Sequence, residues 1–234
     1  MHATDPCFAR SRRRRLPTLT ACVALALAGS GVAAAGASAA SITVAQACVV
    51  NADPAVGSPM TVAGTGFTAG DAINLQSTEG GAFGMATADV NGDFTVSIPA
   101  PTLPTSNPGA SVFTLQAIDE TDDVTTASTA INVANLAVST NPSEAKPSRR
   151  VTWTFSGFNS GAEIYAHYLH GRKVTARTKF GRASGPCGEL KRRAKFYPGK
   201  ARYDSYKVQV DDSFRYSSKT LPRLVATLKT HLHF

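Results

Sequence analysis

The chain has 234 residues, of which 43% are hydrophobic and 17% charged, and its formal net charge is +8. Its most apolar stretch, Leu19–Ala28, is too short and too rich in Ala for a membrane anchor, which needs about 20 apolar residues. The net charge conceals a sorting of charges by position along the chain.

The first 39 residues have the pattern of an export signal. Arg10 and the run Arg12–Arg15 precede the apolar stretch, and the small residues Ala37-Ser38-Ala39 form an A-x-A cleavage site. Cys22 ends a lipobox-like Leu-x-Ala-Cys, but most of the apolar run follows it, which disfavours lipidation. The sequence therefore predicts a signal peptide over 1–39 and a secreted mature protein that begins near Ala40.

Charges of opposite sign occupy opposite halves of the mature chain. Residues 40–134 contain nine acids and no Lys or Arg, whereas residues 135–234 contain nineteen Lys and Arg against six acids. The halves therefore carry −9 and +13, and the basic half could hold a polyanion or its own acidic neighbour.

The mature chain contains an internal repeat. The segment Val62–Ile73 is echoed by Trp153–Ile164 at an offset of 91, with Gly66, Phe67, Gly70 and Ile73 matched by Gly157, Phe158, Gly161 and Ile164. Gly92-Asp93-Phe94 is echoed by Gly188-Glu189-Leu190, and Phe113–Ala117 by Tyr206–Val210. This order of blocks predicts two domains, 40–134 (the first copy) and 135–234 (the second copy), each of the size of an immunoglobulin-like sandwich.

Apolar residues alternate with polar ones in both copies. Alternation over 60–64, 94–98, 151–155 and 206–210 indicates strands, and Asn91-Gly92 is a hairpin turn signal. No segment of the mature chain has an apolar stripe with the helical period. We therefore expect an all-β fold of two tandem β-sandwiches.

The block Gly-Phe-x-x-Gly between two strands has a structural explanation: the glycines allow tight turns and the Phe lies beneath the loop as a core plug. Val62–Asp71 resembles secreted bacterial Ig-like modules, including the IPT/TIG and neocarzinostatin-like families. The resemblance implies a sandwich and no catalytic residue. The second copy departs from it, because Phe155 replaces the first Gly of the motif and the basic stretch Arg172–Lys195 is inserted.

Basic and aromatic residues are interleaved in the middle of the second copy, as a groove for an anionic polymer requires. The alternative is a solvated strand face whose aromatic residues belong to the core. The candidate anion-binding residues are Arg172, Lys173, Arg177, Lys179, Lys191, Arg192, Arg193 and Lys195.

Cysteine and histidine give two further hypotheses. Cys48 and Cys187 are the two cysteines of the mature chain, one in each copy, and either form an interdomain disulfide or stay as separate buried thiols. His167 and His170, together with His231 and His233, could bind zinc only if their strands met. Asp89–Asp93 has part of a calcium loop but is explained by a hairpin turn, so we expect no metal and no cofactor.

The sequence offers little for catalysis. It lacks G-x-S-x-G, H-E-x-x-H and a phosphate-binding glycine loop, and a Cys187–His167 dyad is less plausible than a structural cysteine in a turn. We therefore expect a secreted non-catalytic structural or interaction protein whose partner is an anionic polymer, a cell-envelope component or a protein. The alternative is a neocarzinostatin-like carrier of a small apolar molecule, which would need an apolar cleft beside a sheet.

Overall fold

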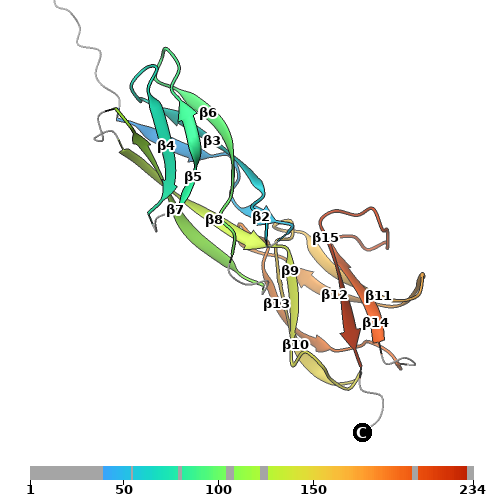
Figure 1. Cartoon of the computed structure of the whole chain (residues 1–234). Helices are drawn as coiled ribbons and strands as arrows, with labels where there is room; N and C mark the ends of the chain where they lie inside the picture. The colour runs from blue at the N-terminus through green and yellow to red at the C-terminus, as the bar shows by residue number, and fades with distance from the viewer. Residues whose placement is uncertain are drawn as a thin grey trace, which may run out of the picture. The chain divides into compact units, whose positions relative to one another are not determined.

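The computed structural model describes residues 39–53, 55–78, 81–103, 108–121, 126–201 and 205–230. The predicted signal peptide lies outside these residues apart from Ala39, and so do His231 and His233. The described residues form strands and turns without any helix, which confirms the all-β prediction (Figure 1). Among them, no segment has the length and apolar character of a membrane-spanning helix.

The first copy folds as a sandwich of two sheets. One sheet has the strand order β1-β3-β6 and the other the order β2-β8-β7-β4-β5, with β2 and β8 parallel and the remaining pairs antiparallel. The strands are β1 (Ser41–Val44), β2 (Val49–Asn51), β3 (Pro59–Thr65), β4 (Ala72–Ser77), β5 (Ala82–Thr87), β6 (Phe94–Pro99), β7 (Ala110–Asp119) and β8 (Thr126–Asn135).

The second copy folds as a sandwich with sheets in the orders β13-β10-β9 and β12-β11-β14-β15, both antiparallel throughout. The strands are β9 (Ala137–Asn141), β10 (Arg150–Ser156), β11 (Glu163–His170), β12 (Lys173–Arg182), β13 (Leu190–Lys195), β14 (Ser205–Asp211) and β15 (Arg223–Lys229).

The two sandwiches have the same strand order. β1-β3-β6 corresponds to β9-β10-β13, and β8-β7-β4-β5 corresponds to β15-β14-β11-β12. They differ at β2, whose place in the second copy is taken by a single parallel bridge between Ala145 and Thr230. The repeat seen in the sequence is therefore a repeat of topology.

The Gly-Phe-x-x-Gly block forms the predicted plug in both copies. Phe67 and Phe158 are 6% and 3% exposed and belong to the cores of their sandwiches. Gly92 and Gly188 have positive φ, and a Cβ on either would overlap the carbonyl oxygen of the Phe. The matched glycines are thus required by close backbone packing against the plug.

Each sandwich has its own buried core, and the two cores differ in composition. The first is mainly aliphatic, with Met60, Ile73 and Leu75 among its fully buried side chains. The second is aromatic: the Trp153 ring lies 5.0 Å from Phe180 and 6.4 Å from Phe196 between centroids. This difference follows from the sequence, because residues 40–134 contain no Tyr or Trp.

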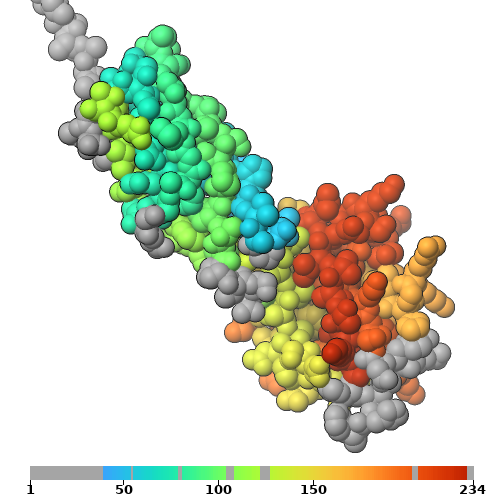
Figure 2. All heavy atoms as spheres, viewed as in Figure 1, coloured from blue at the N-terminus to red at the C-terminus, as the bar shows by residue number. Residues whose placement is uncertain are grey.

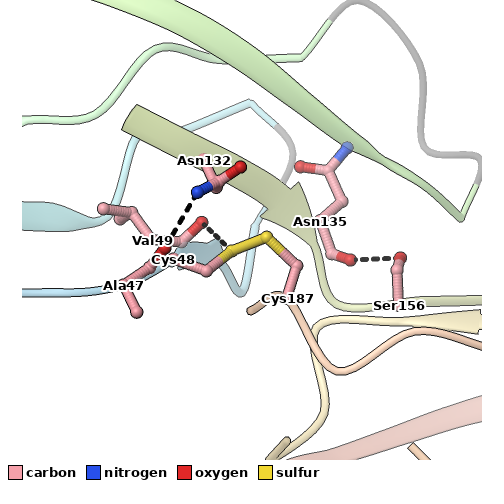
Figure 3. The surroundings of a disulfide bond; sticks show 7 residues. All are labelled: Ala47, Cys48, Val49, Asn132, Asn135, Ser156 and Cys187. Atoms are coloured by element: carbon pink, nitrogen blue, oxygen red, sulfur yellow. Dashed lines mark hydrogen bonds between the residues drawn. A yellow bond between two sulfur atoms is a disulfide. The ribbon is translucent and has the colours of Figure 1, made fainter. Parts of the chain in front are cut away.

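The change from one sandwich to the other occurs at Leu136, between the end of β8 and the start of β9. The Ser156 hydroxyl donates to the Asn135 carbonyl oxygen at 2.8 Å. Cys48, just before β2, and Cys187, just before β13, form a disulfide (Figure 3). The first of the two alternatives for the cysteines is the one found in the structure.

Candidate anion-binding site

Three of the predicted basic residues form a row along β13. Lys191, Arg193 and Lys195 are exposed, and their register partners on β10 are Thr154, Thr152 and Arg150. Directly paired residues of antiparallel strands share a face, and alternate residues on one strand lie about 7 Å apart. We call Lys191, Arg193 and Lys195 the basic row, which lies on the outer face of the sheet β13-β10-β9.

The strands that form the outer face around the basic row contain no acid, and one acid, Glu189, directly before β13, lines a hollow together with Lys191 and Thr154. The strands β9, β10 and β13 together carry Arg150, Lys191, Arg192, Arg193 and Lys195 and no Asp or Glu. The Arg150 guanidinium donates from Nη2 to the Arg193 carbonyl oxygen at 2.9 Å, which orders one side chain of this face. The hydroxyls of Thr152 and Thr154 supply neutral hydrogen-bonding groups between the cations.

The other predicted residues do not join this row. Arg172 precedes β12, and Lys173, Arg177 and Lys179 belong to it, in the opposite sheet. Arg177 and Lys179 pair with His167 and Tyr165 and so lie on the outer face of that sheet, across the core from the basic row. Arg192 pairs with the core residue Trp153 but is exposed because β13 is an edge strand. The basic segment therefore divides between two faces, which sequence spacing alone did not reveal.

Two of the eight residues already have partners within the chain. The Lys179 Nζ lies 2.6 Å from the Glu163 Oε2, and this hydrogen bond raises the pKa of Lys179 and lowers the pKa of Glu163. The Arg177 Nε donates to the His167 Nδ1 at 3.3 Å, and its guanidinium carbon lies 4.4 Å from the centroid of the Phe214 ring. Both residues are therefore less available to a ligand than the basic row.

Basic and aromatic side chains also meet at a hollow beside β12, which has a volume of about 450 Å³. Lys173 and Lys200 line it together with Tyr197 and Tyr206. Both tyrosine rings are buried, with centroids 4.5 Å apart. The aromatic residues that the sequence analysis placed in a possible groove thus belong largely to the core here.

A buried polar cluster on the outer face of the sheet β12-β11-β14-β15 was missed by sequence reasoning. His167, Gln209 and Asp211 are 0%, 2% and 0% exposed. The His167 Nε2 lies 3.2 Å from the Asp211 Oδ1, and the Gln209 Nε2 donates to the Asp211 Oδ2 at 2.6 Å. Because Arg177 donates to Nδ1, the ring proton of His167 is on Nε2.

The pKa of Asp211 is lowered. Burial by itself would raise it, but hydrogen bonds from His167, Gln209 and the Ser213 backbone outweigh that effect. The carboxylate is therefore held ionised inside the cluster.

The described residues contain no group of three or more His, Cys, Asp or Glu suited to a metal. His167 is buried, whereas His170 is exposed at the end of β11, so the pair does not share a ligand geometry. The Asp89 side chain accepts hydrogen bonds from the backbone of Asn91 and Asp93, at 2.8 and 3.0 Å, as in a hairpin turn. These bonds lower the pKa of Asp89, most strongly the bond from Asp93.

A slot of about 270 Å³ opens between β9 and β15 of the second sandwich. Its walls include Val138, Val208 and Leu228, with Trp153 between them and Thr140 beside it. The Trp153 indole N–H is buried and has no acceptor within the described part of the chain. The carrier alternative requires an apolar cleft beside a sheet, and this slot lies in the second copy.

No family model matches this chain, and no curated protein matches its sequence. Among solved structures, a DUF3823 family protein from Bacteroides ovatus is 13% identical, with a TM-score of 0.27 over 83% of this chain and 99% of that one. A calcium-stabilised adhesin with which an Antarctic bacterium binds ice is 15% identical, with a TM-score of 0.28 over 83% and 49%. The C-terminal domain of the Streptococcus agalactiae AgI/II polypeptide BspA is 11% identical, with a TM-score of 0.29 over 82% and 98%. TM-scores of this size establish no relationship, and the sandwich assignment rests on the strand order and register of this chain.

Proposed function

We propose that the protein is a secreted, non-catalytic Ig-like module that binds an anionic polymer through the basic row of its second sandwich. The observation that carries the proposal is the alignment of Lys191, Arg193 and Lys195 on one sheet face whose strands contain no acid. The resemblance of Val62–Asp71 to secreted bacterial Ig-like modules and the predicted signal peptide support an extracellular role.

The expected binding is electrostatic. Cations spaced by about 7 Å along a strand can each meet one charge of an extended polymer that lies parallel to β13. Each contact releases condensed counterions, so affinity should fall steeply as salt is added. A flat face of this kind distinguishes polymers by their charge density and has little selectivity for their chemical structure.

The test is retention on immobilised heparin with increasing salt, compared between two charge-matched triple variants of the full chain. The first replaces the basic row (K191Q/R193Q/K195Q). The second replaces three exposed lysines of the opposite sheet (K173Q/K207Q/K229Q), which have no place in the row. Both remove three charges, so general electrostatics affects them equally.

The first variant should elute at clearly lower salt, and the second should elute close to the wild type. Equal losses for both would mean that only net charge matters and would overturn the assignment to the basic row. If the wild type does not bind at low salt, the acidic first copy is to be tested as an internal competitor by neutralising its exposed Asp89 and half-buried Asp93. Failure of that variant to bind would remove the proposal.

The slot between β9 and β15 favours a second candidate function, the carriage of a small apolar molecule. The core-facing residues of β9 are smaller than those of β1, since Val138 and Thr140 stand where Ile42 and Val44 stand in the first copy. An empty apolar space of this order can hold a molecule of about the size of benzene. Trp153 is the only Trp of the chain, so its fluorescence during titration with cyclohexanone tests this function, and V138I/T140V should abolish any response.

A further inference from the structure

The loop between β14 and β15, residues 212–222, folds back over the outer face of its own sheet, and we call it the cap loop. The Phe214 ring lies edge-on to Tyr165 with centroids 5.8 Å apart, and the Tyr216 ring lies 5.7 Å from His167. Tyr165 and His167 belong to β11, so the loop reaches across β14 to the next strand. The outer face of this sheet is therefore covered by the loop at its centre.

The buried polar cluster holds the backbone of the cap loop. Asp211 accepts from the Ser213 N–H at 3.0 Å, and the His167 Nε2 lies 3.0 Å from the Ser213 carbonyl oxygen. Gln209 donates to the Ser217 carbonyl oxygen at 2.8 Å. Burial of an ionised carboxylate is costly unless it is well hydrogen-bonded, so these bonds give the loop one defined conformation.

In this conformation the cap loop exposes large apolar side chains to solvent. Phe214 is 61% exposed and Leu221 is 78% exposed, and Val225 on the adjoining strand is 53% exposed. We call these three residues the apolar patch. Single exposed hydrophobic residues need no explanation, but we interpret three on one hairpin as a contact surface. Figure 2 shows residues 205–230, in red, forming a continuous part of the surface of the second sandwich.

Positive charges outnumber negative ones around the apolar patch, because the cap loop contributes a single acid, Asp212, whose Oδ2 accepts from the Asn159 Nδ2 at 2.6 Å. Residues 213–230 contain Arg215, Lys219, Arg223 and Lys229 and no Asp or Glu. Arg215 and Lys219 are exposed on the cap loop itself. The partner must therefore offer negative charge at its surface and an apolar interior directly beneath it.

We infer that the cap loop docks on an anionic lipid surface, with the apolar patch entering the interface and the flanking cations contacting the head groups. Apolar side chains beside Lys and Arg are the combination with which peripheral proteins bind the interface of a bilayer. Anionic lipids attract each nearby cation, and burial of each apolar side chain adds to the affinity. A soluble polyanion has no apolar interior that could bury Phe214 and Leu221. The apolar patch lies on the sheet opposite the basic row, so the inference is independent of the proposed function.

The test is co-sedimentation of the full chain with vesicles of phosphatidylcholine, with and without phosphatidylglycerol. The variant F214S/L221S removes two apolar side chains from the loop. Its matched control is V90S/V112S, which changes two residues of the first copy that are 89% and 64% exposed. The variant R215Q/K219Q removes the two exposed cations of the loop.

We expect binding to vesicles that contain phosphatidylglycerol and a partition coefficient at least about tenfold lower for F214S/L221S, because two buried apolar side chains are lost. The control should bind as the wild type does, and R215Q/K219Q should reduce the dependence on phosphatidylglycerol. Trp153 fluorescence and heparin retention should stay unchanged in all three variants, which separates lost docking from unfolding and from a failure of the basic row.

Absence of binding to phosphatidylglycerol vesicles would overturn the inference, as would equal binding by F214S/L221S and the wild type. Equal losses for F214S/L221S and V90S/V112S would attribute binding to general hydrophobicity and would also overturn it. Capture of the wild type by an acidic protein surface, with no vesicle binding, would assign the patch to a protein partner instead.

Discussion

Replacement of Gly92 by Ala should destabilise the first sandwich far more than replacement of Gly70. Both glycines have positive φ, 81° and 84°, so Ala at either costs about 1–2 kcal/mol in backbone conformation. A Cβ at Gly70 meets nothing within 4 Å, whereas a Cβ at Gly92 overlaps the Phe67 carbonyl oxygen. The difference between the two variants therefore isolates the contact with the plug.

The extra cost at Gly92 follows from what must move. The Phe67 N–H donates to the Gly92 carbonyl oxygen at 3.0 Å, and loss of this bond costs about 1 kcal/mol. Phe67 packs on Phe94 with centroids 5.3 Å apart, and complete loss of a buried Phe costs about 3–5 kcal/mol. If half of the packing energy of Phe67 is lost, the backbone, hydrogen-bond and packing costs of Gly92→Ala add up to about 4–5 kcal/mol. Gly70→Ala should cost only the backbone part, about 1–2 kcal/mol.

Calorimetry measures this difference, because the first copy contains no Tyr or Trp to report its unfolding. A gap of about 3 kcal/mol corresponds to more than 10 °C in the melting temperature of a domain of about 100 residues. Trp153 fluorescence follows the second sandwich in the same samples and serves as the internal control. If Gly92→Ala and Gly70→Ala cost the same, the packing of the turn against Phe67 is not what requires the glycine.

Four further outcomes are expected. Phe158→Ala should cost the second sandwich about 3–5 kcal/mol in chemical denaturation followed by Trp153 fluorescence, because the side chain is 3% exposed in an aromatic core. C48S/C187S should lower the free energy of unfolding by up to about 5 kcal/mol, since the bond closes a loop with a sequence separation of 139; an unchanged denaturation midpoint would contradict this. The pKa of Asp211 lies below its ordinary value of 3.8. The ionised carboxylate therefore stabilises the fold above pH 3.8, and this stabilisation is lost as the pH falls through the lower pKa of the folded state. Asp211→Asn should remove this pH dependence from the free energy of unfolding measured between about pH 5 and pH 2. N-terminal sequencing of the secreted protein should begin near Ala40, and a retained Met1 or a lipid on Cys22 would refute the predicted processing.

Local patterns predicted the architecture because they act within one strand or one turn. The alternation over 151–155 predicted β10, and the matched Gly-Phe-x-x-Gly blocks predicted equivalent plugs in both copies, with Phe67 and Phe158 buried as expected. The repeat also explains why the two copies share one strand order, although the order itself comes from the structure and not from the sequence.

The site could be predicted only in part, because it depends on which face each residue takes. Lys179 and Lys191 are twelve positions apart in one basic segment, yet register places them on opposite sheets. The cap loop was missed for a related reason. A polar residue on the outer face of an antiparallel strand is ordinarily solvated. Nothing local to His167 or Gln209 indicates that the loop after β14 folds back to cover it.

The Cys48–Cys187 bond turns most of the molecule into a covalent ring, because the chain from β2 to the turn before β13 lies between its two ends. A protease that cuts once anywhere within this ring opens it without releasing a fragment. The two sandwiches then stay attached through the sulfur atoms although the backbone between them is broken. A nicked molecule would migrate as one species on a non-reducing gel and separate into two pieces only after reduction. The basic row and the cap loop would therefore stay attached to the first sandwich after a cut that would separate the domains of a tandem pair without such a bond.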